Sequence, residues 1–229
     1  MMKSNKLNIL MVVLLAIFIP YILLMGGVRL VMTPNFPAFE YRRASFPADP
    51  FGFTLQERTK WSGYAVSYLT NDKDIDYLGN LQDTTGRKMF APDELDHMVD
   101  VKNVVSTASI VWYVLIGLSL AMFIWLVVMR QWDGIRKALN AGGWATVSLL
   151  GVLLVFLAIS FDQLFTWFHK LFFADGTWTF LESSTLIRLF PFVFWRDAFI
   201  LVFGFALIVG ILLVLLTRKP KAKASQASE

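Results

Sequence analysis

The chain has 229 residues, of which 56% are hydrophobic and 17% are charged, with a formal net charge of +4 at pH 7. This composition is too apolar for a soluble globular domain and is typical of a polytopic membrane protein. The absence of cysteine excludes disulfides, thiol nucleophiles and cysteine-based metal sites, and the basic residues form no patch of the kind that binds nucleic acid.

Four uncharged runs, at 7–28, 103–129, 138–161 and 198–217, predict four transmembrane helices. Each run is long enough to cross a hydrocarbon core of ~30 Å at a rise of ~1.5 Å per residue. We therefore predict an all-α membrane protein. Residues 1–32 form a tail and an uncleaved first helix, and residues 33–102 form a mainly helical cap between the first two spans. Residues 103–217 supply the other three spans, with an outer interfacial segment at 162–197, and residues 218–229 form a basic tail.

The distribution of charge predicts which side of the membrane each segment faces. Residues 33–102 contain eight basic and eleven acidic side chains, and residues 162–197 contain three and four. The amino tail, the 130–137 link and the carboxyl tail are instead dominated by Lys and Arg. The positive-inside rule then places both termini in the cytoplasm and the two long segments on the extracytoplasmic side.

Within the cap, Thr54 and Glu57 match a capping box that starts a helix. An apolar face follows at helical spacing and needs the membrane or the other helices to cover it: Trp61, Tyr64, Ala65, Tyr68 and Leu69. Pro92, with acidic residues in the next two positions, predicts the start of a helix that runs without a break into the second span. Residues 162–173 remain strongly apolar and form either an extension of the third span or a helix in the interface.

The chain contains only two histidines, His97 and His169, each beside the outer end of an apolar run. Imidazole is the side chain that titrates nearest neutral pH, so proton transfer would fall most naturally on this pair. Asp93 and Asp100 lie one helical turn from His97, and Asp162 lies two turns before His169, so each carboxylate could orient a ring. An apolar sequence setting predicts a lowered pKa and a neutral imidazole for His169: Phe165, Trp167, Phe168, Phe172 and Phe173.

Simpler and competing interpretations of these residues stay open. The acidic helix start and the aromatic belt could be structural, and Arg188 could snorkel or bind an anionic or carbonyl oxygen. His97, Asp100, His169 and a further carboxylate could form a metal centre of a lipid hydrolase, although no H-E-x-x-H pattern is present. A non-catalytic protein would instead bind a partner through the apolar face at 61–69. We expect no metal or other cofactor.

Two stretches, 94–103 and 161–173, followed by Trp178 and residues 186–191, resemble the bacterial lipoprotein intramolecular transacylases. The resemblance implies a four-helix protein of the bacterial cell membrane with an extracytoplasmic cap. It also implies an O-to-N acyltransferase that moves the sn-2 acyl chain of a diacylglyceryl-modified lipoprotein to the α-amine of its amino-terminal cysteine, giving a lyso-form lipoprotein. The two catalytic histidines of that family correspond to His97 and His169 in this sequence. The chain departs from the family pattern at Lys170 and Phe192, where an acidic residue is common.

The chemistry sets a geometric requirement. An amine attacks an ester only when neutral, so a base must take its proton and an acid must protonate the departing alkoxide. We predict His169 as the base and His97 as the partner acid or orienting group, with Asp100 and Asp162 in support. Stabilisation of the oxyanion is left open among Lys102, Arg188, Trp178 and a backbone N–H. A shared site requires the two imidazoles to lie within about 12 Å of each other.

Overall fold

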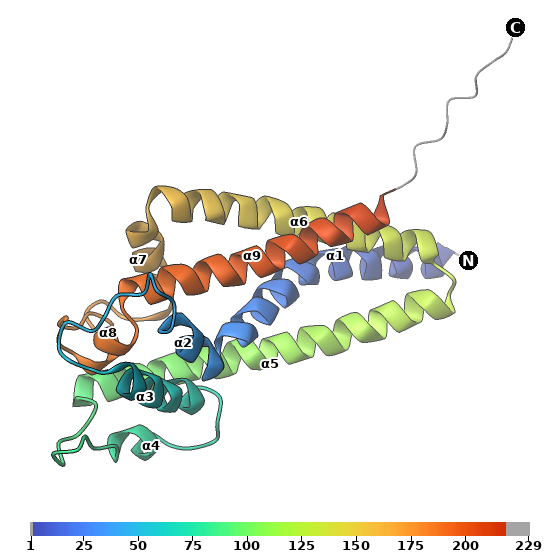
Figure 1. Ribbon diagram of the computed structural model, residues 1–229. Coiled ribbons are helices and arrows are strands. Elements are labelled where there is room, and N and C mark those ends of the chain that lie inside the picture. Colours follow the sequence, from blue (N-terminus) through green and yellow to red (C-terminus); the bar gives the residue numbers. More distant parts are fainter. Residues whose placement is uncertain (1, 219–229) are drawn as a thin grey trace, which may run out of the picture.

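A computed structural model describes residues 2–218, and over this part the chain is helical and contains no strand (Figure 1). Four helices are long and apolar enough to cross a membrane: α1 (Met2–Val31), α5 (Pro92–Val128), α6 (Trp132–Ile159) and α9 (Phe192–Thr217). The prediction of an all-α membrane protein with four transmembrane helices is therefore confirmed. The predicted basic tail lies outside the described residues from position 219 onward.

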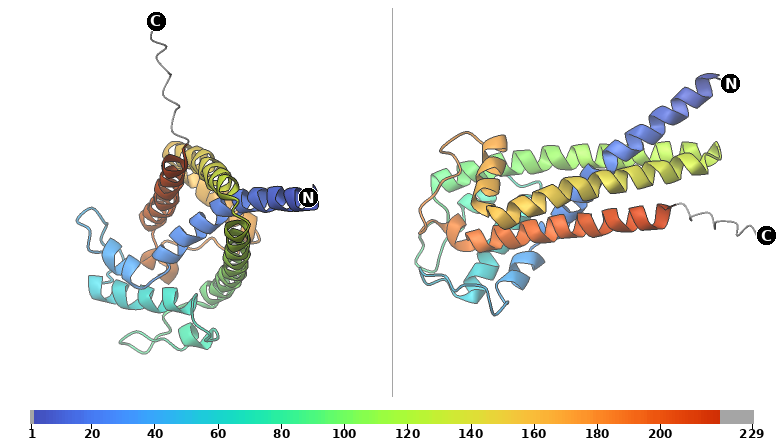
Figure 2. Two further views of the ribbon diagram at one scale, coloured as in Figure 1. Left: turned by 90° about the vertical axis from the view of Figure 1, so that its right-hand side faces the viewer. Right: turned by 90° about the horizontal axis from the view of Figure 1, so that it is seen from above.

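Helices α1, α6 and α9 cross one another in the bundle (Figure 2). They pack closely because glycines, which have no side chain, lie where the helices cross. A Cβ atom added to Gly143 on α6 would lie 2.9 Å from the carbonyl oxygen of Gly210 on α9. One added to Gly27 on α1 would lie 2.8 Å from the carbonyl oxygen of Val202 on α9. These distances are too short for any larger residue, so the glycines determine how closely the three helices approach.

Helix α5 lies against α1 and extends beyond the hydrophobic layer. The Tyr21 hydroxyl donates to the Ala108 carbonyl at 2.9 Å, and the Trp112 indole donates to the Ile22 carbonyl at 3.0 Å. A helix of 37 residues is about 55 Å long, which exceeds a hydrocarbon core of ~30 Å. The uncharged part of this helix is residues 103–128, and the charged first turns, including His97, lie beyond that part.

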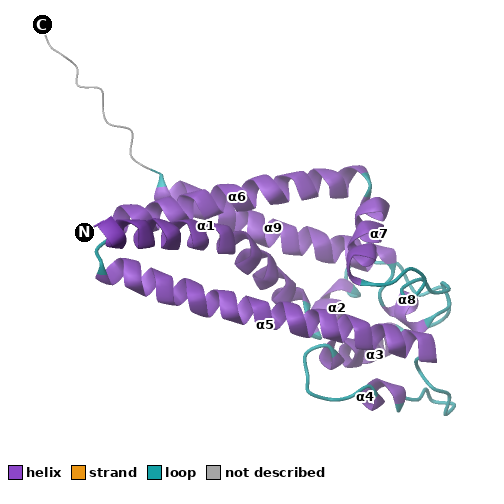
Figure 3. Cartoon of the chain, turned by 180° about the vertical axis from the view of Figure 1, so that it is seen from behind, coloured by secondary structure: helices purple, strands orange, loops and turns teal. Residues whose placement is uncertain are grey.

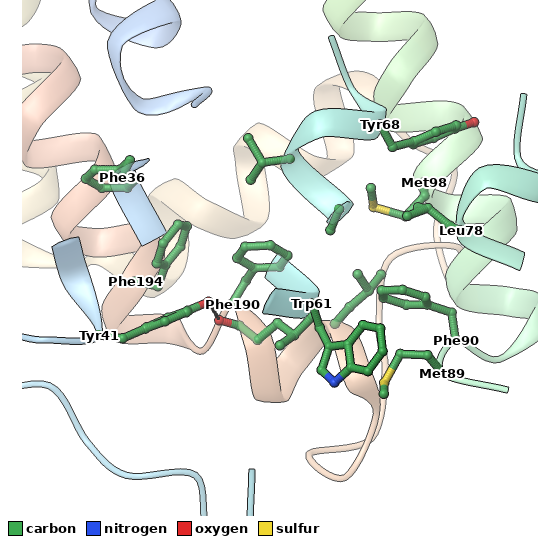
Figure 4. Packing of buried hydrophobic residues seen from close by; sticks show 14 of the residues in the cluster. Phe36, Tyr41, Trp61, Tyr68, Leu78, Met89, Phe90, Met98, Phe190 and Phe194 are labelled. Carbon is green, nitrogen blue, oxygen red and sulfur yellow. Dashed lines mark hydrogen bonds between the residues drawn. The ribbon is translucent and has the colours of Figure 1, made fainter. Parts of the chain in front are cut away.

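The cap is built from α2 (Asn35–Glu40), α3 (Leu55–Tyr68) and α4 (Asp76–Gly79), and it packs on α8 (Thr185–Leu189) and the ends of α5 and α9 (Figure 3). The predicted capping box is present, because Thr54 Oγ1 accepts from the Glu57 backbone N–H and the Glu57 carboxylate accepts from the Thr54 backbone N–H. The predicted apolar face of α3 contributes Trp61, Ala65 and Tyr68 to the buried core of the cap (Figure 4). The tops of the other helices therefore cover this face.

Helix α7 (Phe161–Phe172) lies across the end of the bundle (Figure 1). The backbone breaks at Ser160, which has φ −154° and ψ 84°, so α7 does not continue the direction of α6. Residues 162–172 thus belong to a helix of their own and not to an extension of α6, and the position of that helix in the membrane interface stays a prediction. This turn brings the last residues of α7 toward the first turns of α5.

Candidate active site

His97 and His169 lie side by side at the end of the bundle that carries the cap. His97 comes from the second turn of α5, and His169 comes from the last turn of α7. Their ring centroids are 6.4 Å apart, with 22° between the ring planes, and the residues are only 9% and 8% exposed. Two hydrogen bonds of about 3 Å each can span such a separation, so both rings can contact one substrate group.

The ring of His169 is oriented by the backbone of its own helix. Its Nδ1 atom lies 2.8 Å from the carbonyl oxygen of Phe165, one turn earlier. A carbonyl can only accept, so Nδ1 carries the hydrogen and Nε2 keeps the lone pair. Burial lowers the pKa of His169, and the hydrogen bond to Phe165 opposes this shift only in part. His169 is thus a neutral imidazole with a basic Nε2.

His97 is also held in its neutral form. Its pKa is lowered to about 4, mainly by burial and to a smaller extent by the proximity of His169, while the charge of Asp100 opposes both effects. Its Nδ1 atom is buried and makes no hydrogen bond to any residue in the described part of the chain. Buried polar atoms without a partner are uncommon in folded proteins and cost stability, so this nitrogen is a candidate for contact with substrate.

Aromatic rings surround both imidazoles. Phe173 and Phe180 lie 5.0 Å and 5.4 Å from His97 between ring centroids, and Trp178 lies 4.8 Å from His169. The indole Nε1 of Trp178 is buried and has no hydrogen-bond partner among residues 2–218. The site therefore combines an apolar wall with an N–H donor that no residue in the described part of the chain binds.

The aromatic setting of His169 differs in detail from the predicted one. Phe165, Phe168 and Phe173 lie 4.1, 5.4 and 5.7 Å from His169, whereas Trp167 and Phe172 are exposed on the outside of α7. Phe180 was missed by the sequence analysis. Residues 178 and 180 alternate in a segment without helical structure, and such alternation places both side chains on one side of the backbone. That pattern could have revealed Phe180.

The structure places three other candidate residues away from the two rings. Asp162 is exposed, and the atom of His169 that it was expected to orient is bonded to the Phe165 carbonyl instead. Lys102 donates to the carbonyl oxygen of Lys73 and lies 4.1 Å above the ring of Tyr68. Asp100 is exposed on α5 and affects His97 only through its charge. None of the three groups is seen to hydrogen-bond a histidine in the part of the chain that the structure describes.

Arg188 is occupied within the cap. Its Nη2 atom lies 2.8 Å from Oδ2 of Asp49, whose side chain is fully buried, and its guanidinium lies 3.4 Å above the ring of Phe53. The pKa of Asp49 is lowered by the ion pair and by the backbone N–H groups of Phe53 and Phe51, against the opposing effect of burial. Arg188 thus holds the 49–53 loop on α8.

Glu94 is a positioning residue that the sequence analysis treated only as an acidic helix start. Its buried carboxylate accepts from the backbone N–H of Ala91 at 2.8 Å and from that of Leu186 at 2.7 Å. One bond caps the first turn of α5, and the other ties this turn to α8. Because His97 follows Glu94 by one turn, these two bonds fix the end of α5 on which His97 lies.

At the positions that depart from the family pattern, Lys170 is exposed and Phe192 packs on Phe161, with ring centroids 4.6 Å apart. Within residues 2–218, no three histidine, aspartate or glutamate side chains lie close enough together to hold a metal ion. The ionisable groups that meet at the site are therefore the two imidazoles.

The fold and the site define an integral membrane protein in which a cap covers a buried, aromatic-walled histidine pair at one end of a four-helix bundle. The sequence profile of the family described as "Lipoprotein intramolecular transacylase Lit" matches residues 13–195. The chain therefore belongs to this family.

Individual proteins also match most of the chain. An uncharacterized protein of Aquifex aeolicus (strain VF5) is 30% identical over 212 residues, which cover 88% of this chain and 90% of that relative. The membrane-integral lipoprotein intramolecular transacylase Lit of Bacillus cereus is similar in structure, with a TM-score of 0.77 and 22% identity over 93% of this chain and 94% of that one. A histidine-to-arginine variant of the same Bacillus cereus protein gives a TM-score of 0.71, with 94% of this chain and 92% of that chain covered. At this identity the structural likeness shows that the fold is shared.

Proposed function

We propose that this protein is an intramolecular O-to-N transacylase that acts on diacylglyceryl-modified lipoproteins. It would move the sn-2 acyl chain to the α-amine of the amino-terminal cysteine and release a lyso-form lipoprotein. The observation that carries this proposal is the approach of two buried, neutral imidazoles to a centroid separation of 6.4 Å in a chain of this family.

In the first step, Nε2 of His169 accepts a proton from the cysteine amine as its nitrogen attacks the ester carbonyl carbon. A C–N bond forms, and the carbonyl oxygen takes the negative charge of a tetrahedral intermediate. The hydrogen bond from Nδ1 to Phe165 supports this role because it directs the free lone pair to Nε2. A neutral base is needed here, and the lowered pKa of His169 keeps it neutral at pH 7.

In the second step, the intermediate collapses and the bond between the carbonyl carbon and the sn-2 oxygen breaks. The departing alkoxide takes a proton from the imidazolium formed in the first step, either directly or through His97. The products are an amide and a free sn-2 hydroxyl, no water is consumed, and the imidazoles return to their starting state. Apolar walls that exclude water favour this outcome over hydrolysis.

Proximity is the main contribution that the site makes. Ester and amine belong to one flexible head group, and effective molarities of ~10⁵ M or more are possible when such groups are held together. Phe173 and Phe180 pack on His97, and Trp178 packs on His169, so the rings limit the space in which that head group can move.

Trp178 is the strongest candidate for stabilising the oxyanion. Its buried Nε1–H has no partner in the described part of the protein, and it belongs to a ring that lies against the proposed base. The two alternative cations have other contacts, since Lys102 binds the Lys73 carbonyl and Arg188 binds Asp49.

The positions of the termini and the distribution of charge support the proposed orientation in the membrane. Helix α1 begins and α9 ends at the end of the bundle opposite the cap (Figure 1). The excess of basic residues at that end favours cytoplasmic termini, with the cap and the histidines at the extracytoplasmic interface of a bacterial cell membrane. This is the side on which secreted lipoproteins expose their modified cysteine.

Tandem mass spectrometry of a synthetic diacylglyceryl lipopeptide incubated with the purified protein tests the proposal. We expect a product of unchanged mass in which one acyl group has moved to the cysteine nitrogen. With two lipopeptides that differ in both acyl chain and peptide, we expect no crossed products, because transfer occurs within one molecule. Loss of an acyl group that is blocked by EDTA would instead identify a metal-dependent hydrolase, and an unchanged substrate would favour a non-catalytic, partner-binding protein.

A further inference from the structure

A cavity lies at the end of the bundle opposite the histidines, between the first turns of α6 and the last turn of α9. Its volume is about 560 Å³, and it is lined chiefly by Arg136, Lys137, Asn140, Trp144, Thr217 and Arg218. Further along the same two helices, Gly143 and Gly210 lie in close contact.

The cavity has an excess of positive charge. The carboxylate of Asp133 lies 2.6 Å from Arg136 and 2.8 Å from Lys137, and Arg218 adds a third, exposed cation. Three cations thus line a pocket that one carboxylate neutralises only in part. This arrangement favours an anionic ligand.

The walls are fixed by hydrogen bonds to the end of α9. Asn140 Nδ2 donates to the Thr217 hydroxyl at 3.0 Å and to the Val214 carbonyl at 3.3 Å, and Arg136 donates to the Thr217 carbonyl at 3.5 Å. These bonds satisfy carbonyl groups that a helix end leaves without partners. Lys137 pairs with Asp133 but its side chain is 65% exposed, and Arg218 is exposed as well, so both cations can reach a ligand.

The position of the cavity identifies the kind of anion. It lies at the ends of two membrane-spanning helices, and its wall includes Trp144, which is 53% exposed, as expected for an indole at a membrane interface. Leu212 and Leu216, in the last turns of α9, are also exposed and offer apolar surface to acyl chains. A ligand that matches both features has an anionic head and apolar tails.

We propose that this cavity binds the phosphate head group of an anionic phospholipid, with the phosphate between Lys137 and Arg218 and the glycerol against Trp144. Basic pockets between transmembrane helices are a general means of binding such head groups. The site lies at the opposite end of the bundle from His97 and His169, and it does not depend on the proposed reaction.

Native mass spectrometry of the delipidated full-length protein, titrated with phosphatidylglycerol or with phosphatidylcholine, tests this site. We expect phosphatidylglycerol to bind at least tenfold more tightly than phosphatidylcholine. Arg218→Gln should weaken phosphatidylglycerol binding about fivefold, and the double variant with Lys137→Gln about 25-fold, since each cation near an anionic lipid contributes about that factor.

Arg130→Asn is the matched control. Arg130 lies at the same end of the bundle but outside the cavity, and its φ of 55° is a backbone conformation that asparagine tolerates. We expect this variant to bind phosphatidylglycerol within twofold of the wild type. Equal losses in the Arg130 and Arg218 variants would overturn the proposal, because they indicate general surface attraction. Equal binding of the two lipids, or displacement of the lipid by millimolar inorganic phosphate, would overturn it as well.

Discussion

Replacing Trp178 with phenylalanine separates the two contributions that this side chain makes to the site. In the wild type, the ring centroids of Trp178 and His169 are 4.8 Å apart. The variant keeps an aromatic ring beside His169 and removes the buried Nε1–H. Loss of one oxyanion donor typically lowers a rate constant about 100- to 1000-fold, which corresponds to about 2.7–4 kcal/mol. We therefore expect the rate of N-acyl product formation to fall by about two orders of magnitude or more.

The free energy of unfolding of the same variant should change little. In the free protein the indole N–H is buried without a partner in the described residues, and removing such a group relieves a desolvation cost of about 1–3 kcal/mol, which offsets the packing lost with the smaller ring. The assay combines initial rates, from tandem mass spectrometry of a lipopeptide, with a thermal unfolding curve. The expected result is a slower reaction with an unchanged unfolding temperature.

Trp167→Phe is the matched control, because Trp167 also belongs to this aromatic segment but is 54% exposed on the outside of α7. It should keep the wild-type rate. The reasoning is refuted if Trp178→Phe retains more than about a third of the wild-type rate, since an oxyanion donor cannot be removed at so small a cost.

Further predictions follow from the pKa of the base, from the cap and from the helix crossings. After division by the fraction of substrate amine that is neutral at each pH, the rate should rise with pH along an acid limb whose midpoint lies below 6.5, because burial lowers the pKa of His169 and the base must be neutral; a corrected midpoint above 6.5 contradicts this. Folding stability should fall as pH drops below 6.5, because the unfolded chain takes up the proton first. Arg188→Met should lower the free energy of unfolding by about 3–5 kcal/mol by leaving the buried Asp49 unpaired, while the rate per folded molecule stays unchanged; a double variant with Asp49→Asn should recover much of the stability. Gly143→Ala should lower the unfolding temperature, because its Cβ would lie 2.9 Å from a backbone oxygen, whereas Gly151→Ala, where a Cβ meets nothing within 4 Å, should not; equal effects would argue against close packing at the crossing.

The features that could be predicted from the sequence are those that depend on local pattern. Four uncharged runs predicted the four membrane-spanning helices, and Thr54 with Glu57 predicted the start of α3. Pro92 predicted the first residue of α5. Each of these depends on residues within a few turns of one another, so length, hydropathy and capping chemistry were sufficient.

The contacts that could not be predicted join residues far apart in the chain. Arg188 binds Asp49 across 139 positions, and Glu94 binds the Leu186 backbone across 92. Spacing on a single helix suggested Asp162 as the partner of His169, yet the Phe165 carbonyl on the same helix is closer to the ring nitrogen and needs no desolvation of a charge. The small-residue crossings were missed because their meaning depends on which helices are neighbours.

The site formed by the two histidines could be predicted only in part. They were found because the chain contains no other residue of that type, and the turn at Ser160 that brings α7 over α5 was not foreseen. Only the tertiary structure gives their separation of 6.4 Å. The proposed reaction depends on this approach.

The rate of N-acyl lipopeptide formation by His97→Ala, by His169→Ala and by the double variant is the most direct test of a shared site. Loss of a general acid or base typically lowers a rate 10²- to 10⁴-fold. If both imidazoles serve one reaction, each single variant should fall by at least 100-fold while remaining folded, and the double variant should be no slower than the worse single one. A wild-type rate in either single variant, or losses that multiply in the double variant, would contradict the account.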